Sequence, residues 1–156
     1  MRTIDATPAA PGMRIAVVVA KYNDFVTDRL QAGALAALAK AGVASADITI
    51  IRVPGSFEIS FAARQAAETG DFDAVICLGC LIRGATAHFE YIAAAVSHGI
   101  TAAAAETGVP ITFGVLTTNS VEEAIERAGE GPANKGWEAA LAAVDLATVV
   151  AQLKPQ

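Results

Sequence analysis

AVICLGCLIRGATAHFEY, residues 74–91, joins an apolar run to an alanine-rich segment through a loop bounded by glycines. This order predicts a strand, a loop and a helix. The loop has the spacing of a phosphate-binding loop, Gly79-x-x-x-x-Gly84-x-Thr86, with an alanine in place of the nucleotide-binding lysine. Backbone N–H groups at a helix N-terminus can hold an anion, and His88 follows closely. We therefore expect a seat for a small phosphorylated substrate, rather than ATP, beside an acid–base group.

Apolar segments alternate with helical ones along the rest of the chain. Expected strands cover residues 14–20, 47–53, 73–79 and 110–116. The first expected helix follows the first strand and ends near residue 42, and the others cover about 56–69, 86–107, 119–128 and 134–152. Strands that are apolar throughout and separated by helices predict a parallel sheet covered on both faces. We expect an extended arm over residues 1–12 and one α/β domain over residues 13–156, a three-layer, doubly wound, four-stranded sheet of flavodoxin-like order. Ser56 is expected to cap the second helix.

Composition limits the possible partners. Apolar residues make up 54% of the 156 residues and charged residues only 17%, against about 25% in typical domains, so we expect self-association to cover apolar surface. A net charge of −5 without a basic cluster argues against nucleic acid. The chain shows no run of about 20 apolar residues and no signal-peptide core, so we expect a cytoplasmic protein that does not span a membrane.

Cysteine and histidine placement argues against redox and metal chemistry. Cys77 and Cys80 lie in or beside one apolar strand, and their odd spacing sends them to opposite faces. We interpret them as reduced structural thiols. His88 and His98 lie on different faces of one helix, about 15 Å apart along its axis. We expect no metal.

The carboxyl ends of parallel strands are where ligands bind in such sheets. The site should therefore gather residues 22–23, 55–58, 80–88 and 117–119. His88 is either a packing or capping residue or a proton-transfer group, since imidazole titrates near neutrality. Arg127 is either a cation that favours a helix C-terminus or a clamp for the anion.

Other candidates also have two interpretations. Glu58 either compensates a helix dipole or accepts hydrogen bonds from a polyol. Tyr22 is either a surface aromatic or a stacking platform for a flat heterocycle. Phe113 fits the core by its local pattern. Lys135 fits a solvated first-turn lysine, and Arg83 is either a second anion-binding cation or solvated.

Four segments, residues 53–59, 82–89, 113–117 and 126–136, together resemble the lumazine synthase family. The resemblance covers about residues 14–147 and rests on the order and spacing of the segments. It implies that 5-amino-6-(D-ribitylamino)uracil condenses with 3,4-dihydroxy-2-butanone 4-phosphate to 6,7-dimethyl-8-ribityllumazine, with loss of phosphate and water. This is the penultimate step of riboflavin biosynthesis, and it implies no cofactor.

The resemblance also implies a role for each candidate residue. His88 transfers protons and Arg127 offsets the phosphate charge. The implied substrate-binding residues are Tyr22 on the pyrimidine, Ser56, Phe57 and Glu58 on the ribityl chain, Cys80, Leu81 and Ile82 on the pyrimidine, Ala85 and Thr86 on the phosphate, Lys135, and Phe113 lent by an adjacent subunit. Tyr22 stands where Phe or Trp is commoner, and Ala87 replaces a frequent proline.

The sequence leaves more than one possibility open for the assembly of the chain and for its activity. The family forms pentamers, and some members close twelve pentamers into an icosahedral shell. The short loop over residues 129–133 favours the shell, although its Gly131-Pro132-Ala133 differs from the usual shell-forming loop. A non-catalytic carrier of a ribityl-pteridine, or a structural shell protein on the same fold, is one alternative function. An unrelated flavodoxin-like binder of a phosphorylated ligand is the other.

Overall fold

Four parallel strands form the centre of the molecule, in the order β2-β1-β3-β4. The computed structural model describes residues 1–155. The strands are β1 (Ile15–Ala20), β2 (Ile48–Val53), β3 (Ala74–Ile82) and β4 (Ile111–Thr118). The helices are α1 (Asp24–Lys40), α2 (Ile59–Glu68), α3 (His88–Thr107), α4 (Val121–Arg127) and α5 (Lys135–Leu153), with short 3-10 turns η1 (Ser45–Asp47) and η2 (Ser56–Glu58). The predicted doubly wound, flavodoxin-like sheet is confirmed.

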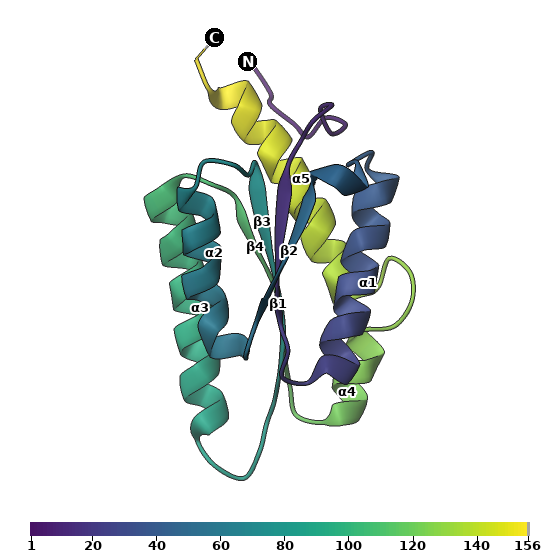
Figure 1. The fold of residues 1–156 in the computed structure, drawn as a ribbon, viewed down its shortest axis with the longest axis vertical. Coiled ribbons are helices and arrows are strands. Elements are labelled where there is room, and N and C mark those ends of the chain that lie inside the picture. Colours follow the sequence, from purple (N-terminus) through teal and green to yellow (C-terminus); the bar gives the residue numbers. More distant parts are fainter. Residues whose placement is uncertain (156) are drawn as a thin grey trace.

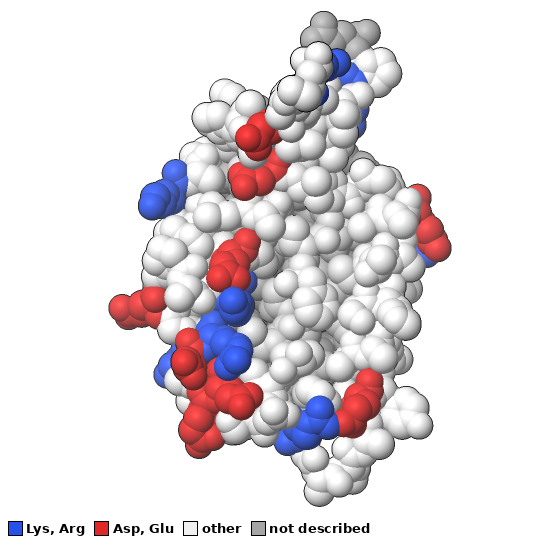
Figure 2. Space-filling model, turned by 180° about the vertical axis from the view of Figure 1, so that it is seen from behind, with Lys and Arg blue, Asp and Glu red and all other residues white. Residues whose placement is uncertain are grey.

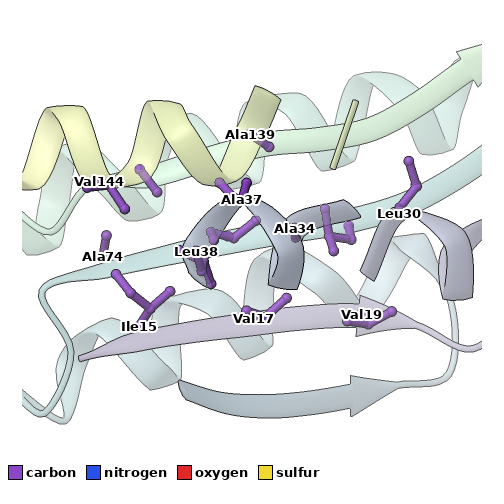
Figure 3. Packing of buried hydrophobic residues seen from close by; sticks show 14 of the residues in the cluster. Ile15, Val17, Val19, Leu30, Ala34, Ala37, Leu38, Ala74, Ala139 and Val144 are labelled. Atoms are coloured by element: carbon purple, nitrogen blue, oxygen red, sulfur yellow. The ribbon is translucent and has the colours of Figure 1, made fainter. Parts of the chain in front are cut away.

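Alternating residues of each strand face different helices. Ile15, Val17 and Val19 of β1 pack with α1 and α5 in one apolar cluster, and Figure 3 shows α1, with Leu30 and Leu38, lying over this face of the strand. The intervening residues of β1 pack against α2 and α3 in a second cluster. Figure 1 shows the resulting three layers, with α1, α4 and α5 on one face and α2 and α3 on the other. Because both faces are covered, the central strands β1 and β3 are apolar throughout.

Two sequence expectations about β3 and its helix are wrong. β3 extends to Ile82 instead of ending at Gly79, and α3 starts at His88 instead of 86. Gly79 therefore lies inside the strand, and the loop spans residues 83–87 alone. A Cβ at Gly79 would lie 2.8 Å from both Ser56 Oγ and Ile59 Cδ1. The glycine is needed for close packing, so the likeness to a phosphate-binding loop does not extend to its first glycine.

Of the helix caps expected from the sequence, one is absent and another is present. Ser56 makes no side-chain cap, because a 3-10 turn precedes α2. Ser120 does cap α4, since its side chain accepts a hydrogen bond from the Glu123 N–H. Just past α1, Gly42 takes a positive φ of 91°, which glycine adopts readily.

The first residues run along the end of α5. The Thr7 N–H donates to Thr148 Oγ1 at 3.1 Å, and Gln152 Nε2 donates to the Asp5 carbonyl at 2.7 Å. Figure 1 shows both chain ends at the amino-terminal end of the sheet. α5 has the length and apolar composition of a membrane span, but it packs on β4 and α1 and contributes four alanines to the apolar cluster shared with α1, which is the behaviour of a core helix.

Candidate active site in two hollows

Two separate hollows contain most of the predicted site residues. The first, of about 640 Å³, lies between the ends of β1, β2 and β3 and the start of α3, and we call it the α3 hollow. The second, of about 510 Å³, lies along β4, α4 and α5, and we call it the β4 hollow. The α3 hollow is lined by Tyr22, Ser56, Phe57, Glu58, Leu81, Ile82, Thr86 and His88, among others. The β4 hollow is lined by Phe113, Arg127 and Lys135, among others.

The division bears on the two interpretations of Arg127. Within one chain Thr86 lines one hollow and Arg127 the other, so the two candidates for holding one anion do not share a hollow of the same chain. Ala85 is exposed and Cys80 is buried, and neither lines either hollow. Phe113 was expected in the core by its pattern. It is 46% exposed and lies on β4, which has a neighbouring strand on one side only.

Asn23 holds the turn that presents Tyr22 to the α3 hollow. Its φ of 61° is the one positive value for a non-glycine residue in the described chain, and asparagine tolerates this left-handed conformation better than most residues. Asn23 Nδ2 donates to the Cys80 carbonyl at 2.9 Å, and the Tyr22 N–H donates to the Pro54 carbonyl at 3.0 Å. Sequence analysis gave Asn23 no role of its own, although its residue type at a strand–helix turn was a signal.

The loop over residues 83–87 is fastened by Arg83. The Arg83 guanidinium forms an ion pair with Glu90 and donates to Asn119 Oδ1 at 3.0 Å. It also stacks over Phe89, 4.5 Å from the ring centre. The Arg83 N–H donates to the Thr118 carbonyl at 2.8 Å. The Arg83 side chain is 46% exposed, and it ties the ends of β3 and β4 to α3 beside His88.

His88 is the first residue of α3, and its side chain lines the α3 hollow. Its backbone N–H lies 3.4 Å from Thr86 Oγ1, and no side chain caps the helix. The first N–H groups of an α-helix have no partner within it. The loop before α3 and the first turn of the helix therefore place backbone N–H groups next to an imidazole, and that of His88 itself donates to Thr86.

The two cysteines are free and buried. Cys77 packs on the α2–α3 side and Cys80 on the α1–α5 side, as the alternation of the strand predicts. Burial raises the pKa of Cys80 to about 11 and that of Cys77 further. Both thiols are therefore protonated at neutral pH and act as apolar packing groups. Within residues 1–155 no three His, Cys, Asp or Glu side chains gather as metal ligands.

In the β4 hollow, cations lie beside an exposed aromatic ring. Lys135 Nζ pairs with Glu138 Oε2 at 3.0 Å, and Arg127 Nη1 donates to the Glu123 carbonyl at 3.1 Å. Sequence analysis missed Glu138, although its spacing of three residues from Lys135 on a helix was a signal. Seen from the side opposite to Figure 1, acidic and basic side chains gather from the left of the centre to the lower left, and a broad uncharged area lies to the right of them (Figure 2).

Comparison with known proteins finds one family. The sequence model described as 6,7-dimethyl-8-ribityllumazine synthase matches residues 12–151. A protein of that name from Syntrophus aciditrophicus is 51% identical over 144 residues, covering 92% of this chain and 94% of the relative. Another of that name from Desulfatibacillum aliphaticivorans is 46% identical over 153 residues, covering 98% and 99%.

Proposed function

This chain belongs to the 6,7-dimethyl-8-ribityllumazine synthase family, and we propose that its two hollows are halves of one active site completed by a second copy. The chain catalyses the condensation of 5-amino-6-(D-ribitylamino)uracil with 3,4-dihydroxy-2-butanone 4-phosphate in riboflavin biosynthesis. The observation behind the two-copy site is the division itself. The proposed proton-transfer residue His88 and the proposed phosphate cation Arg127 line different hollows of one chain.

The α3 hollow binds the ribitylaminouracil. Tyr22 stacks on the pyrimidine, and the backbone of Leu81 and Ile82 borders the ring. Ser56, Phe57 and Glu58 form the turn η2, where Glu58 accepts hydrogen bonds from ribityl hydroxyls. Because Ser56 is buried against Gly79, the turn is held rigidly against the sheet, which limits the entropy lost when substrate binds.

The start of α3 binds the phosphate of the butanone. Backbone N–H groups near Ala85 and Thr86 donate to the phosphate oxygens, and Arg127 of a second copy offsets the charge. Lys135 and Phe113 of that copy cover the remaining side. The substrate amine then attacks the ketone, water leaves as the imine forms, and phosphate is eliminated.

His88 moves the protons of this sequence. It takes a proton from the carbon beside the imine as phosphate leaves and returns one during ring closure, which releases a second water. Holding the amine and the ketone together supplies much of the acceleration, and general acid–base catalysis adds about 10²–10⁴-fold.

Mixing two impaired variants, assayed well below the wild-type KM for the butanone phosphate, tests the two-copy site. His88→Ala removes a group from the α3 hollow, and Arg127→Ala removes one from the β4 hollow. If each site takes its hollows from different copies, co-refolding equal amounts regenerates intact sites at roughly one quarter of the interfaces. Activity of the mixture above the sum of the separate variants is the expected result. No recovery, with mixed oligomers detected by native mass spectrometry, would contradict the proposal.

Self-association supplies the second copy. β4 is an unpaired sheet edge with Phe113 exposed, and edges and apolar patches of this kind mark interfaces. We propose that the chain forms a pentamer in the cytoplasm. We further propose that pentamers close into an icosahedral shell, and the short connection between α4 and α5, residues 128–134, favours this. Sedimentation across a concentration range tests this, and a single pentamer-sized species would contradict the shell.

A further inference from the structure

Asn134 is a buried polar side chain that the proposed chemistry does not use. It is only 2% exposed. Its Nδ2 donates to the Gly129 carbonyl at 2.8 Å and to the Arg29 carbonyl at 3.1 Å. Its Oδ1 accepts from the N–H of Gly136 at 2.8 Å and of Trp137 at 3.2 Å. Both amide protons and the amide oxygen are therefore engaged, which fixes the orientation of the side chain.

Two glycines make room for this side chain where α1 and α5 cross. A Cβ at Gly33 of α1 would overlap the Asn134 amide group. A Cβ at Gly136 of α5 would lie 2.7 Å from the Leu30 carbonyl carbon and 3.0 Å from Asn134 Oδ1. The helices approach closely enough for Asn134 of one to bond the backbone of the other. This contact ties the α4–α5 loop to the core.

The loop that Asn134 holds separates two cations of the β4 hollow. Arg127 is the last residue of α4, and Lys135 is the first residue of α5. Asn134 bonds Gly129, two residues after Arg127, and its own N–H donates to the Gly131 carbonyl at 3.0 Å. It also caps the helix that Lys135 begins. The placement of the backbone at both cations thus depends on one amide group. That group does not itself line their hollow.

We infer that Asn134 is a positioning residue for binding of the phosphorylated substrate, acting through Arg127 and Lys135. This inference rests on the proposed role of the β4 hollow. Within the described residues the Arg127 side chain bonds only the Glu123 carbonyl, so the placement of its guanidinium follows the backbone at the end of α4, which Asn134 holds through Gly129. A displacement of about 1 Å at a positioning group can cost about 10²-fold in rate. Loosening the loop should therefore weaken phosphate binding without changing any group in the hollow.

Three variants test the inference. Asn134→Ser keeps a capping oxygen for α5 but loses both donated hydrogen bonds. Gly33→Ala keeps the asparagine at residue 134, but the added methyl group on α1 pushes the Asn134 side chain out of its position. Gly99→Ala is the matched control, because its added Cβ would lie 2.6 Å from Ser60 Cβ on the α2–α3 face. All three should lower the melting temperature.

Steady-state kinetics distinguish positioning from simple destabilisation. We expect the KM for the butanone phosphate to rise about tenfold in Asn134→Ser and Gly33→Ala with kcat little changed, because lost ground-state binding acts on KM. The KM should be unchanged in Gly99→Ala. The double variant Asn134→Ser/Gly33→Ala should show less than the summed effect, since both changes act through one side chain. Wild-type KM in the first two variants, or the same shift in Gly99→Ala, overturns the inference.

Titration with inorganic phosphate separates this inference from the proposed function. Calorimetry should show weaker phosphate binding in Asn134→Ser and Gly33→Ala than in wild type and Gly99→Ala. If wild type turns over and all four proteins bind phosphate equally, the positioning role fails while the function stands. If wild type does not turn over but the two variants still lose phosphate affinity, the function fails while the positioning role stands.

Discussion

The α3 hollow and the β4 hollow are built in different ways. The α3 hollow is held by the sheet itself: Ser56 is buried against Gly79, and Asn23 bonds the Cys80 carbonyl. The β4 hollow presents exposed groups on an edge strand and on the ends of two helices, with Lys135 paired to Glu138. One chain therefore fixes the geometry of the α3 hollow through its core, whereas the β4 hollow faces outward. This difference is what a site shared between copies requires.

Removing the imidazole should have the largest effect on catalysis. His88→Ala is expected to lower kcat by about 10²–10⁴-fold, the usual contribution of a general acid–base group. The oligomer should stay intact, because His88 is exposed at the first residue of α3. Lumazine absorbance measures turnover, and sedimentation measures assembly. Unchanged turnover would remove His88 from proton transfer.

The opposite hollow should respond in binding rather than in chemistry. Arg127→Ala is expected to raise the KM for the butanone phosphate about 10- to 100-fold, because a hydrogen bond to a charged group contributes about 1.5–3 kcal/mol. The KM for the ribitylaminouracil should change little. Initial rates with each substrate varied in turn measure both constants. Equal shifts in the two KM values would show that the hollows do not divide the substrates.

Two glycines of residues 79–84 should differ in their tolerance of a methyl group. Gly79→Ala adds a Cβ 2.8 Å from Ser56 Oγ and should destabilise the fold by about 1–3 kcal/mol through overpacking. Gly84→Ala meets no atom within 4 Å and should stay within about 0.5 kcal/mol of wild type. Urea unfolding measures both. Comparable losses would mean that the α3 hollow is not braced by close packing.

The smallest effect on catalysis should come from the Arg83 clasp beside His88, which consists of Arg83 and its partners Glu90, Asn119 and Phe89. Arg83→Lys keeps the charge but loses the planar group that bonds Asn119 and stacks on Phe89, so we expect a decrease in kcat of about threefold to tenfold. KM for the butanone phosphate in the same assay should move less than in Arg127→Ala. A larger KM effect would make Arg83 a phosphate ligand.

Glu90 gives a spectroscopic measure of the same clasp. A hydrogen bond from its own backbone N–H and, to a lesser extent, Arg83 lower the pKa of Glu90 below its ordinary 4.5, although desolvation opposes them. A lowered folded pKa stabilises the fold above the unfolded value, and this stabilisation is lost as pH falls through the folded value. Because Arg83→Met removes the hydrogen bond and the charge that lower the Glu90 pKa, NMR titration should give a higher Glu90 pKa in this variant than in wild type. An unchanged pKa would argue against the ion pair in solution.

The order of strands and helices could be predicted because apolar runs and glycine turns are local signals. The end of β3 could not. Gly79 looked like the start of a loop, yet the space it leaves is filled by Ser56 from a distant segment. The resemblance to the family made Arg127 and Phe113 candidates, but the separation of Arg127 from His88 depends on α3 and α4 packing on opposite faces of the sheet. Asn134 was predicted only near the helix start, because its bonds to Arg29 and Gly129 join parts of the chain that sequence spacing does not relate.

The first residues and the end of α5 lie at the amino-terminal end of the sheet (Figure 1), where Gln152 bonds the Asp5 carbonyl. The α3 hollow is lined instead by residues at the carboxyl ends of the strands. A domain fused to either end would be carried on the side away from the substrates. Neighbouring ends are also the geometry that circular permutation requires. A chain reconnected there by a short linker, and opened in an exposed turn such as the one at Gly42, is therefore a practical route to relocating an attachment point without rebuilding the catalytic edge.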